Sequence, residues 1–160
     1  MKRRLLLTLA ASLLAAGAVA QVPDPKGPQP ELPKEKLVIV NHDGKEHVFN
    51  VEMATTSEQE RVGEMFRTSI PEDGGMLFDW GSPQSTQMWM KNTLLSLDMI
   101  FINNNGTIRS IAENTVPRSL AVIDAGGPVR AALEVNAGTS AKLGIRVGDT
   151  VKQRIFGNAP

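Results

Sequence analysis

Cysteine and tyrosine are absent from this chain of 160 residues, which also has only two histidines, two tryptophans and five phenylalanines. Without cysteine, the chain cannot form disulfide bonds, thiolate zinc or iron–sulfur sites, or a thiol nucleophile. Two histidines leave little material for imidazole chemistry. The fold must therefore be stabilised by its hydrophobic core, and about 140 residues are enough to bury one self-sufficient core.

An excess of positive charge is also missing. The whole chain has 17 basic and 17 acidic side chains. Three of the basic ones are Lys2, Arg3 and Arg4, and the remainder of the chain has 14 basic against 17 acidic side chains, a formal charge of −3. Because neutralising phosphates requires a basic face, the sequence predicts no nucleic-acid partner.

The first twenty residues have the three regions of a secretory signal peptide. A charged start is followed by an apolar run over residues 5–19 and by the small-residue ending Ala18-Val19-Ala20. An uncleaved membrane anchor is the competing interpretation, but alanine, serine and glycine dilute a run that would need about twenty strongly apolar residues. We expect cleavage before Gln21, no membrane span afterwards, and a periplasmic or extracellular location.

Residues 21–36 hold five of the ten prolines, mixed with charged side chains. This composition is typical of an extended linker. We expect a single domain over residues 37–160.

Short apolar runs separated by turn signals predict a mainly β domain. Strands are expected at residues 37–40, 47–54, 75–78, 86–90, 97–102, 107–114, 120–123, 130–136 and 150–156. Ser57 and Glu60 have the spacing of a capping box, which predicts a helix over residues 57–66. A further helical turn is expected at residues 140–143, closed by Gly144. The predicted fold is a compact antiparallel barrel or sandwich of roughly eight to nine short strands with one short helix.

Five short motifs follow one another along this predicted domain: Gly74-Gly75-Met76-Leu77-Phe78, Trp89-Met90-Lys91-Asn92-Thr93, Leu97-Asp98, Leu133-Glu134-Val135-Asn136-Ala137-Gly138 and Gly148-Asp149. In this order and spacing, they resemble the signature of the uncharacterised family catalogued as domain of unknown function 192. The resemblance spans about residues 38–154 and implies a compact mainly β fold, often exported, with no established activity. Glu64 stands where the family pattern usually has leucine.

Alternation along the strands separates core side chains from candidate functional ones. In the segment 86–93, Met88, Met90 and Asn92 should share one face, and Trp89 and Lys91 the other. In the segment 130–136, Glu134 and Asn136 should lie opposite the apolar side chains. Asp98 begins a strongly apolar strand on the side of its core residues, so it should be partly buried and need a partner.

Two interpretations of these residues remain open. In the structural one, Lys91 or an arginine pairs with Asp98 or Glu134, Asn92 and Asp149 bond to backbone in turns, and Trp89 covers the core edge. In the functional one, an aromatic wall meets convergent charge in a small-ligand pocket. The residues of that pocket would be Trp89, Lys91, Asn92 and Glu134, with Arg61 and Asp98 as further candidates.

A catalytic version would use Glu134 or Asp98 as general base and Lys91 to stabilise negative charge. No serine lies in a nucleophile-elbow context, so the sequence favours a noncatalytic accessory domain that binds a small polar ligand or a protein partner. The alternative is an extracytoplasmic hydrolase-like enzyme that uses carboxylate acid–base chemistry. Six methionines follow Met1 and could attract cuprous ions, but core packing accounts for them better. We expect no metal and no cofactor.

Overall fold

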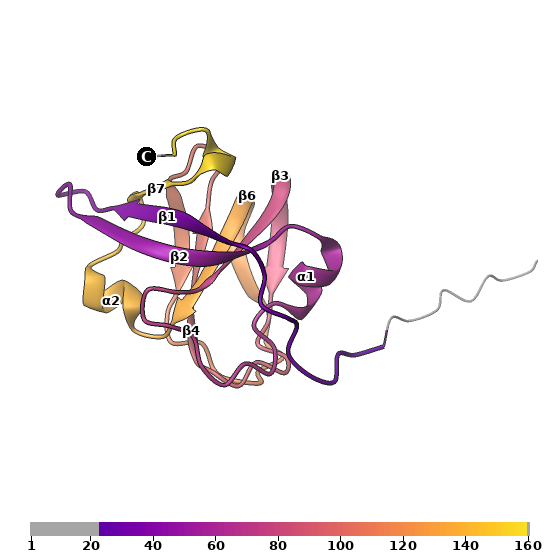
Figure 1. The fold of residues 1–160 in the computed structure, drawn as a ribbon. Coiled ribbons are helices and arrows are strands. Elements are labelled where there is room, and N and C mark those ends of the chain that lie inside the picture. Colours follow the sequence, from indigo (N-terminus) through magenta and orange to yellow (C-terminus); the bar gives the residue numbers. More distant parts are fainter. Residues whose placement is uncertain (1–22, 160) are drawn as a thin grey trace, which may run out of the picture.

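The computed structural model describes residues 23–159, so the predicted signal peptide lies outside the described residues. Within this range the strands are β1 (Lys34–Val40), β2 (Glu46–Ala54), β3 (Met76–Met88), β4 (Leu97–Ile102), β5 (Ile108–Ala112), β6 (Ile123–Asn136) and β7 (Thr150–Lys152) (Figure 1). The helices are α1 (Ser57–Val62), α2 (Thr139–Leu143) and a 3₁₀ turn, Arg154–Phe156.

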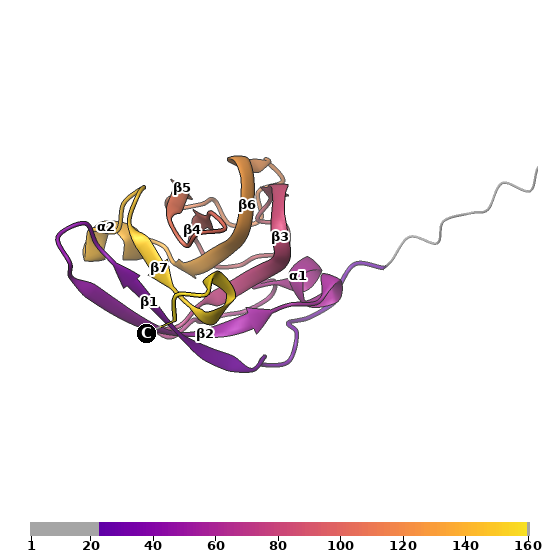
Figure 2. The same ribbon diagram turned by 90° about the horizontal axis from the view of Figure 1, so that it is seen from above.

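The seven strands form one sheet in the order β5-β4-β6-β3-β2-β1-β7. The pairings are antiparallel except for β2 with β3, which run parallel. The sheet curls until its two edge strands approach each other, as the view from above shows (Figure 2). An isolated bridge between Thr107 and Thr150 and a hydrogen bond from Ile108 N to Asp149 O (2.9 Å) connect these edges. The result is a nearly closed β-barrel, which confirms the predicted mainly β class.

Strand β4 and the second half of β6 are buried on both faces. The concave face holds the main core, which includes Leu37, Phe49, Leu77, Ile100 and Leu133. The opposite face of β3, β4 and β6 is covered by two smaller apolar clusters: Met90, Leu97, Met99, Phe101, Ala125, Val129 and Ala132 in one, and Leu32, Ala54, Met76 and Phe78 in the other. A polar side chain on this outer face therefore has apolar surroundings.

The strand count is seven, and the expected eight to nine is corrected because two pairs of predicted strands are continuous. Segments 75–78 and 86–90 are the two ends of β3, whose register against β6 shifts between Asp79 and Gln84. The segment 130–136 is likewise the second half of β6, which starts at Ile123. Glycine and proline at 81–83 and 126–128 mark irregularities within paired strands, a role that single-sequence patterns do not distinguish from a turn.

The helices are short. The capping box of α1 is formed by Thr56 and Gln59, one residue earlier than the predicted Ser57 and Glu60, and the helix ends at Val62 rather than residue 66. It ends there because Gly63 takes a positive φ of 49°. The second helix, closed by Gly144, matches its prediction. Among residues 23–159, no helix is long and apolar enough to cross a membrane.

The proline-rich segment ahead of the barrel is packed against it. The first strand begins at Lys34, three residues before the expected start at Leu37. Leu32 is buried, and its backbone N–H donates to Glu52 Oε2 (2.7 Å). Gln29 Nε2 donates to the carbonyl oxygen of Gly63 (2.9 Å), so the segment lies beside α1 (Figure 1). The predicted linker therefore contributes surface to the domain from at least Gln29 onward.

Candidate functional site

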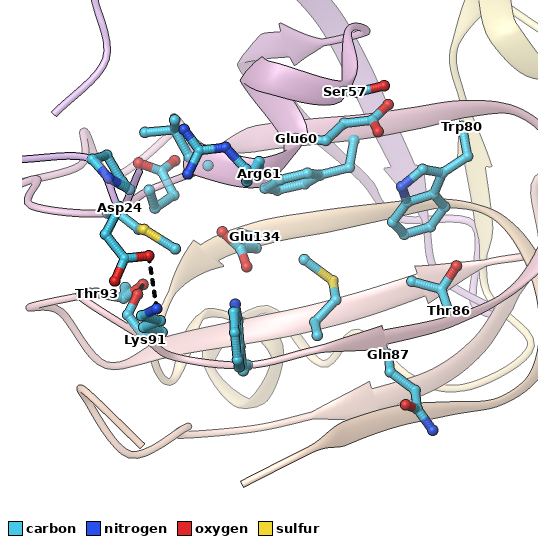
Figure 3. Close-up of a pocket in the computed structure, with 18 residues that line it drawn as sticks. Asp24, Ser57, Glu60, Arg61, Trp80, Thr86, Gln87, Lys91, Thr93 and Glu134 are labelled. Carbon is cyan, nitrogen blue, oxygen red and sulfur yellow. Dashed lines mark hydrogen bonds and ion pairs between the residues drawn. The ribbon is translucent and has the colours of Figure 1, made fainter. Parts of the chain in front are cut away.

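A cavity of about 470 Å³ opens on the outer side of the sheet, between α1, β3, β6 and the N-terminal segment (Figure 3). We call it the Glu134 cavity. Its lining combines aromatic, thioether and ionisable side chains: Phe78, Trp80 and Trp89; Met65 and Met88; Asp24, Glu60, Arg61, Glu64, Lys91 and Glu134. Ser57, Thr86, Gln87 and Thr93 add hydroxyl and amide groups.

Glu134 lies at the centre of this view, between Glu60 and Arg61 of α1 on one side and Lys91 on the other (Figure 3). It stands on the outer face of β6, where its neighbours across the sheet are Met76 and Met99. Only 4% of the residue is exposed, but its carboxylate oxygens are not among the fully enclosed polar atoms that have no partner, and the side chain borders the cavity. Strand alternation places this carboxylate outside the main core but inside an apolar layer.

Burial raises the pKa of the Glu134 carboxyl well above its usual value, and the nearby charge of Glu64 raises it further. Burial in an apolar layer weakens the hydration that stabilises the ionised form of the carboxyl. Glu134 therefore holds its proton over a wider pH range than an exposed glutamate does.

Glu64 is a second buried carboxyl beside the cavity, and sequence reasoning did not select it as a site residue. It follows the turn at Gly63 and is 3% exposed. Burial raises its pKa to about 7, the charge of Arg67 partly offsets this, and the charge of Glu52 adds to it. Arg67 Nε lies 3.2 Å from Glu64 Oε2, while its two terminal nitrogens bind Glu52 at 2.7 Å each. Arg67 thus contacts both Glu52 and Glu64, and its two hydrogen bonds to Glu52 are shorter than its contact with Glu64.

The mouth of the cavity carries ion pairs. Lys91 Nζ lies 2.8 Å from Asp24 Oδ1 of the N-terminal segment and 5.3 Å from the centre of the Trp89 ring. Arg61 makes a two-pronged contact with Glu58 at 2.6 and 2.8 Å. Trp89 remains 48% exposed. Both cations of the lining are therefore already paired, whereas the carboxylate at the centre is not.

Four of the predicted site residues, Arg61, Trp89, Lys91 and Glu134, line this cavity. The alternation argument was wrong in one respect, because Met88 lines it as well. Strand β3 ends at Met88, so Trp89 and Lys91 lie in the following loop, where a period of two no longer applies.

Asn92 and Asp98 do not line the cavity. Asn92 has a positive φ of 56°, and its carbonyl oxygen accepts from Phe66 N–H (2.9 Å), a structural role in a turn. Asp98 is fully buried, and its oxygens accept backbone N–H groups from Asn114 (2.9 Å), Gly138 (3.1 Å) and Ser140 (2.8 Å). Asp98 was expected to need a partner, and its partners are these three backbone N–H groups rather than Lys91 or an arginine.

The remaining cavity residues were missed by sequence reasoning. Trp80 and Phe78 lie on β3, and Glu60 on α1, and no short motif joins these segments. Within residues 23–159, no group of three or more histidine, aspartate or glutamate side chains is arranged to hold a metal ion. Aromatic walls with a few convergent polar groups are typical of small-molecule sites.

Comparison with known proteins identifies the family to which this chain belongs. A family model with the description "Uncharacterized ACR" matches residues 38–153. The chain belongs to the DUF192 family. This confirms the resemblance carried by the five sequence motifs, and the matched range contains every cavity residue except those of the N-terminal segment.

Two solved structures are similar to this DUF192 protein. One, from Sinorhizobium meliloti 1021 and described as a candidate transcription regulator, is 43% identical, covers 79% of this chain and 98% of its own, and gives a TM-score of 0.77. The other, a protein of unknown function from Novosphingobium aromaticivorans DSM 12444, is 35% identical, covers 90% of this chain and 100% of its own, and gives a TM-score of 0.74. A comparison with curated proteins finds no match.

Proposed function

We propose that this DUF192 protein is a noncatalytic binding domain that holds a small organic molecule in the Glu134 cavity. The observation that carries the proposal is the buried carboxylate of Glu134, which has no hydrogen-bond donor within residues 23–159 and adjoins a cavity of about 470 Å³. A carboxyl that stands in apolar surroundings and borders a cavity can form a strong hydrogen bond or ion pair with a ligand bound there.

The lining supports a ligand with an apolar part. Phe78, Trp80 and Trp89 offer large flat surfaces, and Met65 and Met88 can adapt to the shape of a bound molecule. One relative is described as a candidate transcription regulator. The formal charge of −3 beyond the first basic cluster argues against nucleic acid as the ligand. The signal-peptide features of residues 1–20 support a periplasmic or extracellular location for this binding.

Tryptophan fluorescence provides a direct assay, because Trp80 and Trp89 are the two tryptophans of the sequence and both line the cavity. A panel of small amphiphilic cations, anions and neutral compounds should include ligands that change the emission in a saturable way. Thr86→Phe should abolish the change by filling the cavity from β3. Ser85→Phe, at the adjacent exposed position outside the lining, should not.

Failure of every charge class to produce a saturable, Thr86→Phe-sensitive change would contradict the binding proposal. A change that both phenylalanine variants retain would also contradict it, because binding would then lie elsewhere.

A second candidate function is hydrolysis by carboxylate acid–base chemistry. The proximity of Glu134 and Glu64, each with a raised pKa, favours it, since a proton-holding carboxyl can serve as a general acid. Chromogenic esters and glycosides would test it. A saturable rate that disappears in Glu134→Gln and persists in Glu113→Gln, an exposed glutamate outside the cavity, would favour the enzyme.

A further inference from the structure

The charges that line the Glu134 cavity are unbalanced. Its acidic side chains are Asp24, Glu60, Glu64 and Glu134, and its basic ones are Arg61 and Lys91. Lys91 already binds Asp24 (2.8 Å), and Arg61 already binds Glu58 (2.6 Å). Within residues 23–159, Glu134 has no basic partner. The missing counter-charge in this cavity is therefore positive.

The aromatic rings have the matching preference. The face of an indole ring carries partial negative charge and attracts cations, more strongly where water is excluded. The Trp89 ring already holds the ammonium group of Lys91, 5.3 Å from its centre. Trp80 and Phe78 line the same cavity from β3. Aromatic faces beside an unpaired carboxylate are the surroundings that bind ammonium groups.

We propose that the ligand of the Glu134 cavity is an organic cation, a primary amine or quaternary ammonium compound, whose charged group lies against the Glu134 carboxylate near the tryptophan rings. This inference rests on the proposed binding function and specifies its ligand class. An anionic ligand would compete with Asp24 for Lys91 and with Glu58 for Arg61, and it would lie in a lining that has more acidic than basic side chains. A neutral ligand would leave only the ionised form of Glu134 without a counter-charge, whereas a cation would stabilise that ionised form.

Several charged groups face Glu134 from the elements packed around it: Glu60 and Arg61 from α1, Glu64 and Arg67 from the segment after it, Lys91 from the loop after β3, and Asp24 from the N-terminal segment. Among these, Glu60 and Glu64 have raised pKa values, mainly because of burial, and like Glu134 they lose their protons as the pH rises. Each of these ionisations makes the cavity more negative. Cation affinity should therefore increase with pH.

The test compares compounds of one shape and different charge. Choline and 3,3-dimethylbutylamine are the cations, 3,3-dimethylbutan-1-ol is the neutral analogue of choline, and 3,3-dimethylbutanoate is the anion. Tryptophan emission of the full chain is titrated with each compound at fixed ionic strength. We expect at least one cation to bind at least tenfold more tightly than the alcohol, and the carboxylate to bind more weakly than the alcohol.

Two variants test whether the Glu134 carboxyl causes the preference for cations. Glu134→Gln should weaken cation binding at least tenfold and leave the alcohol unchanged, while Glu113→Gln, which removes an equal charge outside the cavity, should change neither. If Glu134→Gln does not fold, the pH dependence of ligand binding to the unaltered protein tests the same proposal. Between pH 6 and pH 8 the affinity for the cation should rise severalfold, and that for the alcohol should stay constant.

Three results would overturn the cation proposal: equal binding of choline, amine and alcohol; tighter binding of the carboxylate than of either cation; or no saturable binding of either cation. Each is distinguishable from failure of the binding function, because the broad panel with Thr86→Phe and Ser85→Phe reports on ligands of every charge.

Discussion

Glu64 should make the stability of this protein depend on pH. It is 3% exposed, and its pKa is raised to about 7 mainly by burial. The family pattern usually has leucine at this position. Two replacements remove the ionisable group: Glu64→Leu, which follows the pattern, and Glu64→Gln, which keeps the shape. In either variant Arg67 retains its two 2.7 Å contacts with Glu52.

The direction of the effect follows from the two protonation states. Below pH 4.5, Glu64 is protonated in both the folded and the unfolded chain, so it adds no pH-dependent term. Between pH 4.5 and 7 the unfolded chain ionises first, and the free energy of unfolding falls. A rise of the pKa from 4.5 to about 7 corresponds to a loss of about 3 kcal/mol, complete above pH 7. The variants should avoid this loss.

Urea unfolding at pH 4.5, 6, 7 and 8 measures the effect. The stability of Glu64→Gln relative to the unaltered protein should increase by about 3 kcal/mol from pH 4.5 to pH 8, with most of the increase complete by pH 7. Glu64→Leu should show the same increase, added to a constant packing difference. The exposed control Glu113→Gln should show a nearly constant difference. A constant difference for both Glu64 variants would refute the argument that burial raises this pKa.

Three further predictions concern other parts of the chain. Asp98→Asn should lower the free energy of unfolding by about 3 kcal/mol, because the amide opposes one of three backbone donors, while the exposed Asp124→Asn should cost under about 1 kcal/mol; urea unfolding measures both. Gly75→Ala should cost about 3 kcal/mol in the same assay, because its Cβ would overlap the carbonyl oxygen of Glu134; unchanged stability would contradict this close approach. Mass analysis of protein from its native host should show a chain that begins at Gln21, and an intact exported precursor would contradict the signal-peptide prediction.

The sequence was most informative where side-chain periodicity and strand structure agree. The apolar run at 97–102 is β4 to the residue, and the alternation around Glu134 correctly opposed it to Leu133 and Val135. Trp89, Lys91 and Glu134 were expected to share one side of the fold, and they line one cavity. The inferences for residues 97–102 and for Glu134 required only the local geometry of a strand. The one for Trp89 and Lys91 gave the right side of the fold although these residues lie in the loop after β3.

The rest of the site depends on contacts between distant segments. The pairing of β3 with β6 brings Trp80 near Glu134, and the position of α1 adds Glu60 and Arg61. No local pattern encodes that arrangement. Asp98 was grouped with the site because a buried carboxylate needs a partner. Its partners are backbone groups whose positions depend on the loops around α2. The raised pKa of Glu64 likewise requires knowledge of its burial.

The docked N-terminal segment also affects how this domain should be handled in the laboratory. Asp24, on Lys91 at the cavity mouth, would be the fourth residue of a chain cleaved before Gln21. The new terminal ammonium group would then stand only a few residues from the entrance. An affinity tag at this end would change the charge and access of the cavity, whereas the same tag at the other end of the chain, after Pro160, would leave this entrance intact.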